Sequence, residues 1–270
     1  MEAVRTADRD RYLSVLYAPE DKRAPLFALY AFNAEIASIR DRIHEPLPGE
    51  IRLQWWRDAI AKDDAQGHPF AAILLETIRR HDLPRKAFDD YLEARTFDLY
   101  DDPMPDRTAL EGYCGEVASA LIQLAALVLD PKAAPAAADA AGHAGCAQAI
   151  TGLIRLIPLH RARRQCFVPR DMLAAVGTSP EDFVAGKDGA AARRGVAAMA
   201  ALAEEHLAKF EALAAAISET LRPAFLPLGL TGSYLEKINK ASFDAVHKNA
   251  DISTIKRHWL MYQRASRGWR

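Results

Sequence analysis

The stretch from Leu26 to Asp41, LFALYAFNAEIASIRD, constrains the fold more than any other part of the chain. Apolar residues occupy nearly every direction around a helix of this sequence, which is typical of a helix surrounded by protein. Asn33, Ala37 and Asp41 are spaced four apart and therefore line one narrow stripe of that helix. A polar stripe on a buried helix must face a partner group or a cavity, because an unpaired polar group is costly to bury. What lies against this stripe should therefore determine what the protein does.

The composition fits one large globular domain or two small ones. The chain has 270 residues, 50% of them hydrophobic, and a formal net charge of -1. These values place it among ordinary globular proteins, and the near-zero charge gives no overall attraction to nucleic acid or to an anionic membrane. No run of 18 apolar residues is free of charges, so we expect no membrane-spanning helix. The charged N-terminal segment MEAVRTADRDRY lacks the apolar core of a secretory signal, and we expect a cytoplasmic protein.

Helical periodicity recurs along the whole chain, whereas the alternating pattern of a β-strand does not occur in it. Prolines and glycines separate the periodic segments, as at the predicted turn over residues 44–49. The predicted helices span residues 5–18, 20–43, 50–62, 70–80, 84–100, 107–129, 132–157, 190–220, 232–248 and 252–266, and a loop from residue 158 leads into a short helix. The adjacent Trp55 and Trp56 favour core packing over lining a ligand cavity. The sequence therefore predicts an all-α fold of roughly ten to twelve helices around one core.

The cysteine pattern argues against a structural metal site. Cys114, Cys146 and Cys166 are widely spaced, and no pair has the CxxC spacing. Zinc sites in proteins usually contain such close cysteine pairs. We therefore expect three reduced thiols, mostly buried.

Five segments in a fixed order resemble the squalene/phytoene synthase superfamily over essentially the whole chain. They are PEDKRAPLFALYAF at residues 19–32, Asp98 before a linker, GYCGEVASAL at 112–121, AQAITGLIR at 147–155 and FVPRDML at 167–173. Their order and spacing carry the resemblance, since none of them is specific alone. The resemblance implies a single domain over residues 1–270, with an isoprenoid-synthase-like helical bundle around a central cavity.

The typical members of that family join two prenyl diphosphates head to head. Two aspartate-rich helical motifs face each other across the cavity and hold magnesium ions on the diphosphates. This arrangement is physically reasonable, because the diphosphates bring several negative charges into an apolar space. Hard cations with oxygen ligands neutralise such charges, and Mg²⁺ is the usual choice.

The first aspartate-rich motif is eroded in this sequence. The family pattern Asp-Asp-x-x-Asp falls on Ala37, Ser38 and Asp41, so that one carboxylate of three is left. The arginine that precedes the motif is replaced by Ala34. Asp41 alone cannot build a site for three magnesium ions.

The second motif and the N-terminal phosphate anchor are also altered. Arg155 remains, but Leu156 and His160 stand where the family has its two carboxylates. The sequence Asp-Arg-Asp-Arg at residues 8–11 replaces the N-terminal anchor. We therefore predict no metal and no cofactor, with Mg²⁺ only if the protein is a synthase with non-standard ligands.

The variant segments YAFNAEI, IRLQWWRD and LIRLIPLH resemble a divergent branch of the superfamily. That branch includes a mitochondrial assembly factor for respiratory complex I and its bacterial relatives. The resemblance implies a pseudoenzyme that works as an assembly factor or binds a lipid or isoprenoid. Its partner would be a hydrophobic or isoprenoid small molecule, or a subunit of the respiratory complex. The alternative is a prenyl transferase that condenses prenyl diphosphates with non-standard ligands.

Six polar residues are the candidates for lining a cavity or binding a ligand, and none is assigned a catalytic role. They are Asn33, Asp41, Asp98, Gln148, Arg155 and His160. Asp41 is better explained by an ion pair, with Arg155 or a neighbour of Arg40, than by ligand binding. His160 could exchange a proton near neutral pH. It belongs to the basic segment 160–164, which fits a solvated loop or a clamp for phosphate or carboxylate.

The C-terminal segment KRHWLMYQRASRGWR interleaves cationic residues with Trp259, Tyr262 and Trp269. A helix of this kind can rest on a membrane surface, bind a partner or pack against its own domain. Peripheral contact with the inner face of a membrane is therefore one prediction for this segment. Nucleic-acid binding has no motif behind it and is not expected.

Overall fold

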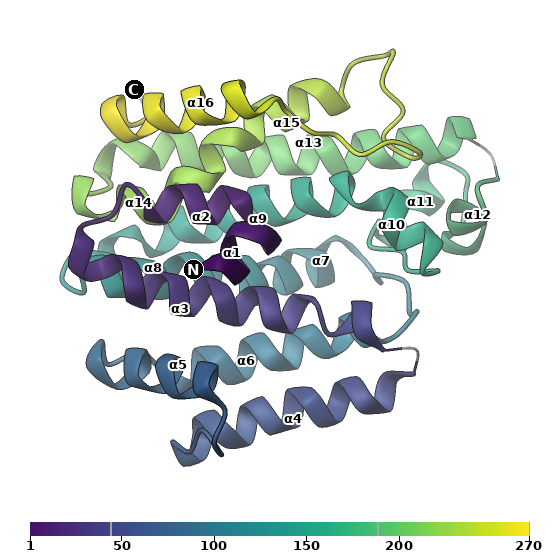
Figure 1. Cartoon of the computed structure of the whole chain (residues 1–270). Helices are drawn as coiled ribbons and strands as arrows, with labels where there is room; N and C mark the ends of the chain where they lie inside the picture. The colour runs from purple at the N-terminus through teal and green to yellow at the C-terminus, as the bar shows by residue number, and fades with distance from the viewer. Residues whose placement is uncertain (44, 188, 270) are drawn as a thin grey trace.

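The computed structural model describes residues 1–43, 45–187 and 189–269, and its helices lie side by side in a bundle (Figure 1). No β-strand occurs within these ranges, which confirms the predicted all-α fold. The α-helices are α1 (Glu2–Ala7), α2 (Arg9–Val15), α3 (Glu20–Ala37), α4 (Pro46–Lys62), α5 (Pro69–Arg80), α6 (Arg85–Arg95), α7 (Arg107–Cys114), α8 (Ala120–Leu129), α9 (Ala138–Arg155), α10 (Ile157–Ala162), α11 (Arg170–Ala175), α12 (Pro180–Ala185), α13 (Gly189–Leu213), α14 (Arg222–Phe225), α15 (Thr231–Ile238) and α16 (Thr254–Arg267).

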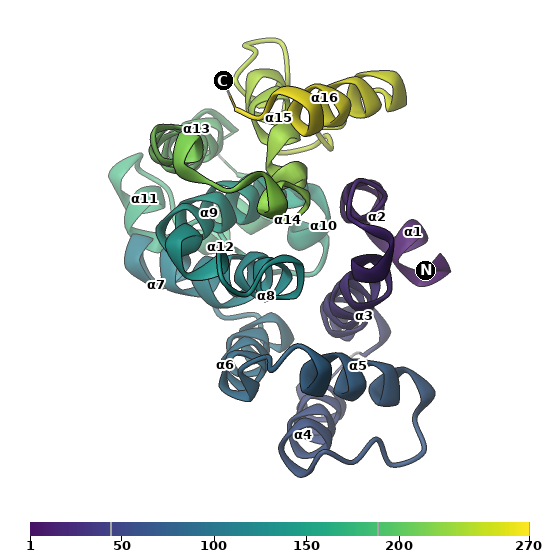
Figure 2. The same cartoon turned by 90° about the vertical axis from the view of Figure 1, so that its left-hand side faces the viewer.

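The bundle has two large hydrophobic clusters. One joins α3, α4, α5, α6 and α8, and the other lies around α7, α9 and α13. The view along the helices shows α4 and α5 at one edge of the molecule and α15 and α16 at the opposite edge (Figure 2). Trp56 is fully buried in the first cluster, against the ring of Phe32, which confirms its predicted role in the core. Most residues of α3 from Leu26 to Ile36 belong to this first cluster. The helix is thus surrounded by apolar neighbours, as its sequence predicts.

The central helix ends earlier than its apolar pattern predicts. Its α-helical part stops at Ala37, and a 3₁₀ turn, η1 (Arg40–Arg42), follows. The hydroxyl of Ser38 donates to the carbonyl of Glu35, and the guanidinium of Arg40 bonds to Asp101. These contacts accompany the change from α-helix to the tighter 3₁₀ turn. Serine side chains often compete for backbone hydrogen-bonding groups in this way. The predicted stripe from Asn33 to Asp41 is therefore interrupted.

Prolines caused two of the other misplaced boundaries. Helix α4 begins at Pro46, inside the predicted turn 44–49, of which residue 44 lies outside the described part. Pro158 lies in the first turn of α10, within the segment predicted to be a loop. Proline is tolerated in the first turn, because the backbone N–H groups there have no partner within the helix. The prediction for residues 232–248 was too long, since α15 ends at Ile238.

Residues 107–129 form one continuous helical segment with a π-helical turn, η3 (Gly115–Ser119), between α7 and α8. By length and composition this segment alone, among the described residues, is apolar enough to span a membrane. Two-thirds of its apolar window (67%) is buried by the rest of the bundle. That burial is typical of a core helix, in which apolar residues contact other helices.

Helix α9 approaches η3 closely at Gly145, which lies against Ser119. A β-carbon placed on Gly145 would lie 2.3 Å from the backbone nitrogen of Ser119 and 2.4 Å from its α-carbon. The backbone of η3 cannot move aside as a flexible side chain would. Glycine is therefore required at this position of an otherwise alanine-rich helix.

We predict that Gly145→Ala destabilises the protein by about 1–3 kcal/mol, the usual cost of overpacking a core. Gly142→Ala on the same helix is the matched control, because its β-carbon would have no neighbour within 4 Å. The control should stabilise the protein by about 0.5–1 kcal/mol, since alanine favours a helix over glycine. Urea unfolding of both variants measures the difference, and equal stabilities would contradict the close contact.

Candidate functional site

The polar group on α3 that the sequence singles out is satisfied from α6. The side-chain oxygen of Asn33 accepts a hydrogen bond of 2.9 Å from the Tyr91 hydroxyl and a longer one, 3.4 Å, from the Arg95 guanidinium. Arg95 also donates to the Tyr91 hydroxyl at 3.2 Å. Asn33 is buried, so these two residues of α6 are the partner group that its burial requires.

Asp98 belongs to the same network, on the other side of Arg95. Its carboxylate accepts from Arg95 at 2.9 Å and from the Tyr113 hydroxyl at 2.7 Å. Burial and then the Asp98 carboxylate raise the pKa of Tyr113 well above its usual value, so that its hydroxyl stays protonated as a donor. The structure thus brings Asn33 and Asp98 together through Arg95, a residue that the sequence analysis did not select. The charge of Arg95 is neutralised within the bundle.

Asp41 does not join this network. Its carboxylate forms an ion pair with Arg163, at the end of α10, and is half-exposed. The predicted ion pair at Asp41 therefore exists, but its partner is Arg163 rather than Arg155. Asp41 lies in η1, beyond the end of α3, and so does not continue the polar stripe of that helix.

His160 is buried among apolar groups. Its ring lies 4.6 Å from the ring of Phe167, and its Nδ1 has no hydrogen-bond partner among the described residues. Burial, and to a lesser degree the charge of Arg163, lower the pKa of His160 to about 4. The prediction of a solvated loop was therefore wrong for this residue. A neutral imidazole here is not poised to exchange a proton near pH 7.

Arg155 faces away from α3 and toward the C-terminal part of the chain. Its guanidinium lies 3.7 Å from the centre of the Tyr234 ring and donates to the carbonyl of Ala250 at 2.8 Å. The carboxylate of Asp251 is 3.8 Å away. A cation stacked on an aromatic ring and bonded to a carbonyl is held firmly in place.

The N-terminal helix α2 supplies a carboxylate to this cationic region. Asp10 accepts a 2.6 Å hydrogen bond from Arg257 of α16 and a 3.1 Å hydrogen bond from the Tyr234 hydroxyl. Arg257 also bonds to Asp251 at 2.8 Å. Burial raises the pKa of Asp10, although the charges of Arg257 and Arg155 oppose the shift. This cluster of Asp10, Arg155, Tyr234, Asp251 and Arg257 joins α2, α9, α15 and α16.

The N-cap carboxylate of α2 holds a second, partly buried arginine. Asp8 caps α2 by accepting from the backbone N–H of Arg11, and it also pairs with the Arg11 guanidinium at 2.5 Å. Arg11 in turn lies over the ring of Tyr30 on α3. The alternation of acidic and basic residues at 8–11 indicated in the sequence that charges here would be paired. The partners of Asp10 on α15 and α16 could not be derived from that pattern.

The remaining candidate, Gln148, is half-buried on α9, and its side chain makes no hydrogen bond or ion pair with a described residue. Two pockets lie elsewhere. One of about 360 Å³ is between α3 and α5, and one of about 600 Å³ is between α10 and α12. None of the six candidate residues lines either pocket. A ligand role for Gln148 therefore stays a prediction.

The residues present do not fit a magnesium site of the family type. Within the part of the chain that the structure describes, no three His, Cys, Asp or Glu side chains are grouped so that they could hold a metal ion. The three cysteines are free and buried, as predicted. Burial raises the pKa of the Cys146 thiol to about 11 and that of Cys166 to about 12. These two thiols are therefore protonated at neutral pH and are poor nucleophiles, because thiolate is the reactive form.

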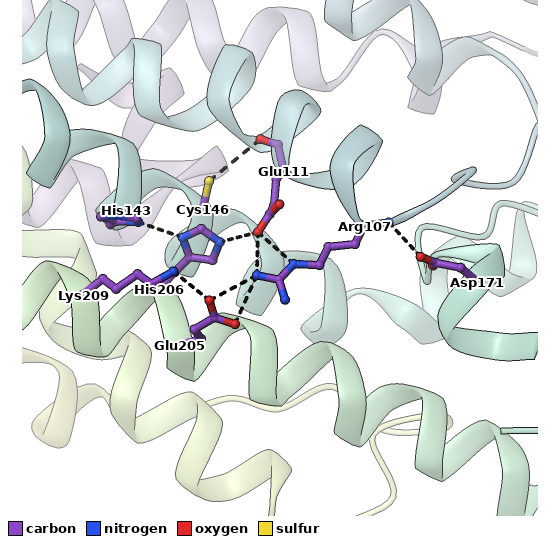
Figure 3. A network of polar contacts seen from close by, with 8 residues as sticks. All are labelled: Arg107, Glu111, His143, Cys146, Asp171, Glu205, His206 and Lys209. Atoms are coloured by element: carbon purple, nitrogen blue, oxygen red, sulfur yellow. Dashed lines mark hydrogen bonds and ion pairs between the residues drawn. The ribbon is translucent and has the colours of Figure 1, made fainter. Parts of the chain in front are cut away.

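A further polar network joins α7, α9 and α13 on another side of the bundle (Figure 3). The Nδ1 atoms of His143 and His206 are 3.0 Å apart, and Nε2 of His206 is 3.0 Å from Glu111. Arg107 bridges Glu111 and Glu205. One of the two Nδ1 atoms must carry the hydrogen that they share. Every charged group in this network has a partner, and it therefore serves to fasten the three helices.

Comparison with known proteins gives the same assignment as the fold. The family model described as squalene/phytoene synthase matches residues 4–260. The chain belongs to the squalene/phytoene synthase family.

Relatives within this family carry different names. The chain is 33% identical to NADH dehydrogenase (ubiquinone) complex I, assembly factor 6, of Bos taurus, over 92% of this chain and 75% of the relative. It is 27% identical to chloroplastic phytoene synthase 1 of Arabidopsis thaliana, over 65% of this chain and 43% of that protein. The solved structure of a dehydrosqualene synthase in complex with ligand superposes with a TM-score of 0.83 at 17% identity, covering 98% of this chain and 93% of that one. This likeness confirms the isoprenoid-synthase-like fold.

We predict that His160 makes stability depend on pH between about 6.5 and 4. The unfolded histidine takes up its proton near pH 6.5, whereas the buried one does so only at about 4. The unfolded state therefore binds more protons in this window, and stability falls as the pH is lowered through it. The loss should amount to about 3 kcal/mol relative to His160→Leu, measured by urea unfolding of both proteins across the window. Parallel curves for the two proteins would contradict the burial of the neutral imidazole.

Proposed function

We propose that this protein is a non-catalytic member of the squalene/phytoene synthase family that acts in the assembly of respiratory complex I. Its partner is a subunit or assembly intermediate of that complex, and it works at the inner face of the membrane that contains the complex. The relationship to assembly factor 6 of Bos taurus supports this role, since it extends over nearly the whole chain. The likeness to solved synthases supports the fold only.

The observation that carries the proposal is the pairing of Asp10 with Arg257. An arginine with a tyrosine hydroxyl and a second arginine beside it is well suited to bind a phosphate group. Here the carboxylate of Asp10 already accepts from both Arg257 and Tyr234, and Asp8 holds Arg11 in the same way. A diphosphate would have to displace these carboxylates from partly buried ion pairs. Removing one partner of a buried pair costs about 3–5 kcal/mol, which opposes such a displacement.

The residues at the two aspartate-rich motifs are also poorly suited to bind the magnesium ions that a synthase uses. Ala37, Ser38 and Leu156 have no carboxylate, and His160 is buried beside Phe167. Asp41 is the remaining acidic residue of the two motifs, and Arg163 neutralises it. A single paired carboxylate is a weak ligand set for Mg²⁺, which needs near-octahedral oxygen coordination.

The first test measures turnover. We expect the purified protein, incubated with farnesyl or geranylgeranyl diphosphate and Mg²⁺, to release no diphosphate above background. The same protein should gain no thermal stability from the diphosphate with Mg²⁺, because a ligand that binds the folded state raises the melting temperature. Farnesol, tested in parallel, examines binding of the hydrophobic chain alone. Turnover in the range of roughly 1 s⁻¹ or more, ordinary for enzymes, would favour the alternative of an active prenyl transferase.

The second test measures assembly. Cells that lack the protein should contain less fully assembled complex I, resolved on a native gel and stained for NADH oxidation. The wild-type chain should restore the complex, and so should Asp41→Ala, because the proposal assigns no metal chemistry to that residue. A normal amount of complex I in the deleted cells would contradict the proposal. Rescue by the wild type but not by Asp41→Ala would favour the catalytic alternative.

A further inference from the structure

The C-terminal helix α16 presents a hydrophobic and aromatic stripe to the solvent. Ile255, Trp259 and Tyr262 are 83%, 62% and 57% exposed. Spacings of four and three residues place them on one face of the helix. Both views of the bundle show α16 at the outer edge, opposite α4 and α5 (Figures 1 and 2). Large exposed hydrophobic groups collected on one face indicate an interaction surface.

The opposite face of α16 is firmly anchored, which fixes the direction of the stripe. Arg257 and Met261 are buried against the bundle. Arg257 pairs with Asp10 of α2 and Asp251, and it also bonds to the Tyr234 hydroxyl. The outward position of Trp259 and Tyr262 is therefore a consequence of well-formed contacts on the other side of the helix.

The permanent charges on α16 itself have one sign. Helix α16 contains no acidic residue, and its permanently charged cations besides the buried Arg257 are Lys256, Arg264 and Arg267. Arg267 is exposed and forms no ion pair with a described residue, whereas Lys256 lies 3.6 Å from Glu236. The helical positions of Lys256 and Arg267 place both cations on the same flank of the stripe.

The stripe continues onto the connection between α2 and α3. Leu16 and Tyr17 are exposed there, although most large hydrophobic residues nearby are buried. Helix α16 packs against α2, which this connection follows directly. Burial and then the neighbouring Tyr262 raise the pKa of Tyr17. The surface formed by Leu16, Tyr17, Ile255, Trp259 and Tyr262 is called here the aromatic edge.

We propose that the aromatic edge binds the surface of an anionic lipid bilayer, with α16 lying in the plane of the membrane. Tryptophan and tyrosine have an apolar ring and a polar tip, and they are favoured at the boundary between headgroups and acyl chains. The flanking cations lie at the depth of the lipid phosphates. Amphipathic helices with aromatic residues on one face and Lys or Arg beside it bind membranes in this orientation.

A lipid surface fits these observations better than a protein partner does. The aromatic edge is the outside of a single helix and a short loop, and neither of the two pockets lies in it. Protein interfaces usually bury hot-spot aromatic residues in a matching pocket, and they contain complementary charges of both signs. The inference goes beyond the role in complex I assembly and does not depend on it, because lipid binding is measured with the purified protein alone.

The test is co-flotation of the full chain with lipid vesicles. One set contains phosphatidylglycerol and phosphatidylcholine in equal parts, and the other contains phosphatidylcholine alone. We expect binding to the anionic vesicles, and binding at least about tenfold weaker for Trp259→Ser/Tyr262→Ser, because burial of a large side chain is lost. Arg267→Gln should weaken binding by about fivefold, the contribution of one cation near an anionic surface.

The matched control is Ile51→Ser/Ile73→Ser at the opposite edge, where the two side chains are 62% and 57% exposed. This control should bind as the wild type does. All these residues are exposed, so the melting temperatures of the variants should stay close to that of the wild type. The proposal is overturned if the wild type does not bind anionic vesicles, or binds neutral vesicles equally well. It is also overturned if the control loses as much binding as the Trp259 and Tyr262 variant, or if that variant binds as the wild type does.

Discussion

The ion pair between Asp10 and Arg257 joins the two ends of the chain. Asp10 is on the second helix and Arg257 on the last, yet the Arg257 guanidinium donates a 2.6 Å hydrogen bond to the Asp10 carboxylate. The hydroxyl of the buried Tyr234 donates to the same carboxylate. Both side chains are largely withdrawn from solvent, so neither would be tolerated there without the other. The same contact fixes the position of α16 and neutralises a cation that would otherwise be free to bind an anion.

The same principle applies throughout the interior of the bundle. Arg95 is held by Asp98 and by neutral oxygens, and Arg11 is held by Asp8. Buried charges in proteins are paired because their desolvation is costly. A synthase of this fold would bring charged substrate and metal ions into such a region. It would need charged side chains that have no partner within the protein and can bind these ions. Here the arginines are already paired with carboxylates of the same chain. This pairing is the structural basis for proposing a role without catalysis.

The fold was predictable from the sequence because its main signals are local. Apolar residues at helical spacing and proline or glycine between them place most of the helices, and the order of the family segments gives the architecture. The errors arose where a distant contact decided a boundary. Helix α3 stops at Ala37 because Arg40 and Asp41 are drawn to Asp101 and Arg163, which are far away in the sequence. Pro158 lies in the first turn of a helix instead of preventing one.

The site was predictable only in part for the same reason. Asn33 was expected to face a partner group or a cavity, and Asp98 was selected as a ligand candidate. Arg95, which joins them, has no motif of its own. His160 was placed in a basic solvated loop because of its neighbours in the sequence, whereas its ring packs against Phe167. The partner of Asp10 is 247 residues away along the chain, and no local pattern identifies it.

The central claim is that these internal pairs leave no place for a metal-bound diphosphate. Calorimetric titration of the wild-type protein with inorganic pyrophosphate in the presence of Mg²⁺ tests it most directly. We expect no saturable binding at concentrations up to about 1 mM, which corresponds to a binding free energy weaker than about -4 kcal/mol. Saturable binding at micromolar concentrations that requires Mg²⁺ would contradict the account.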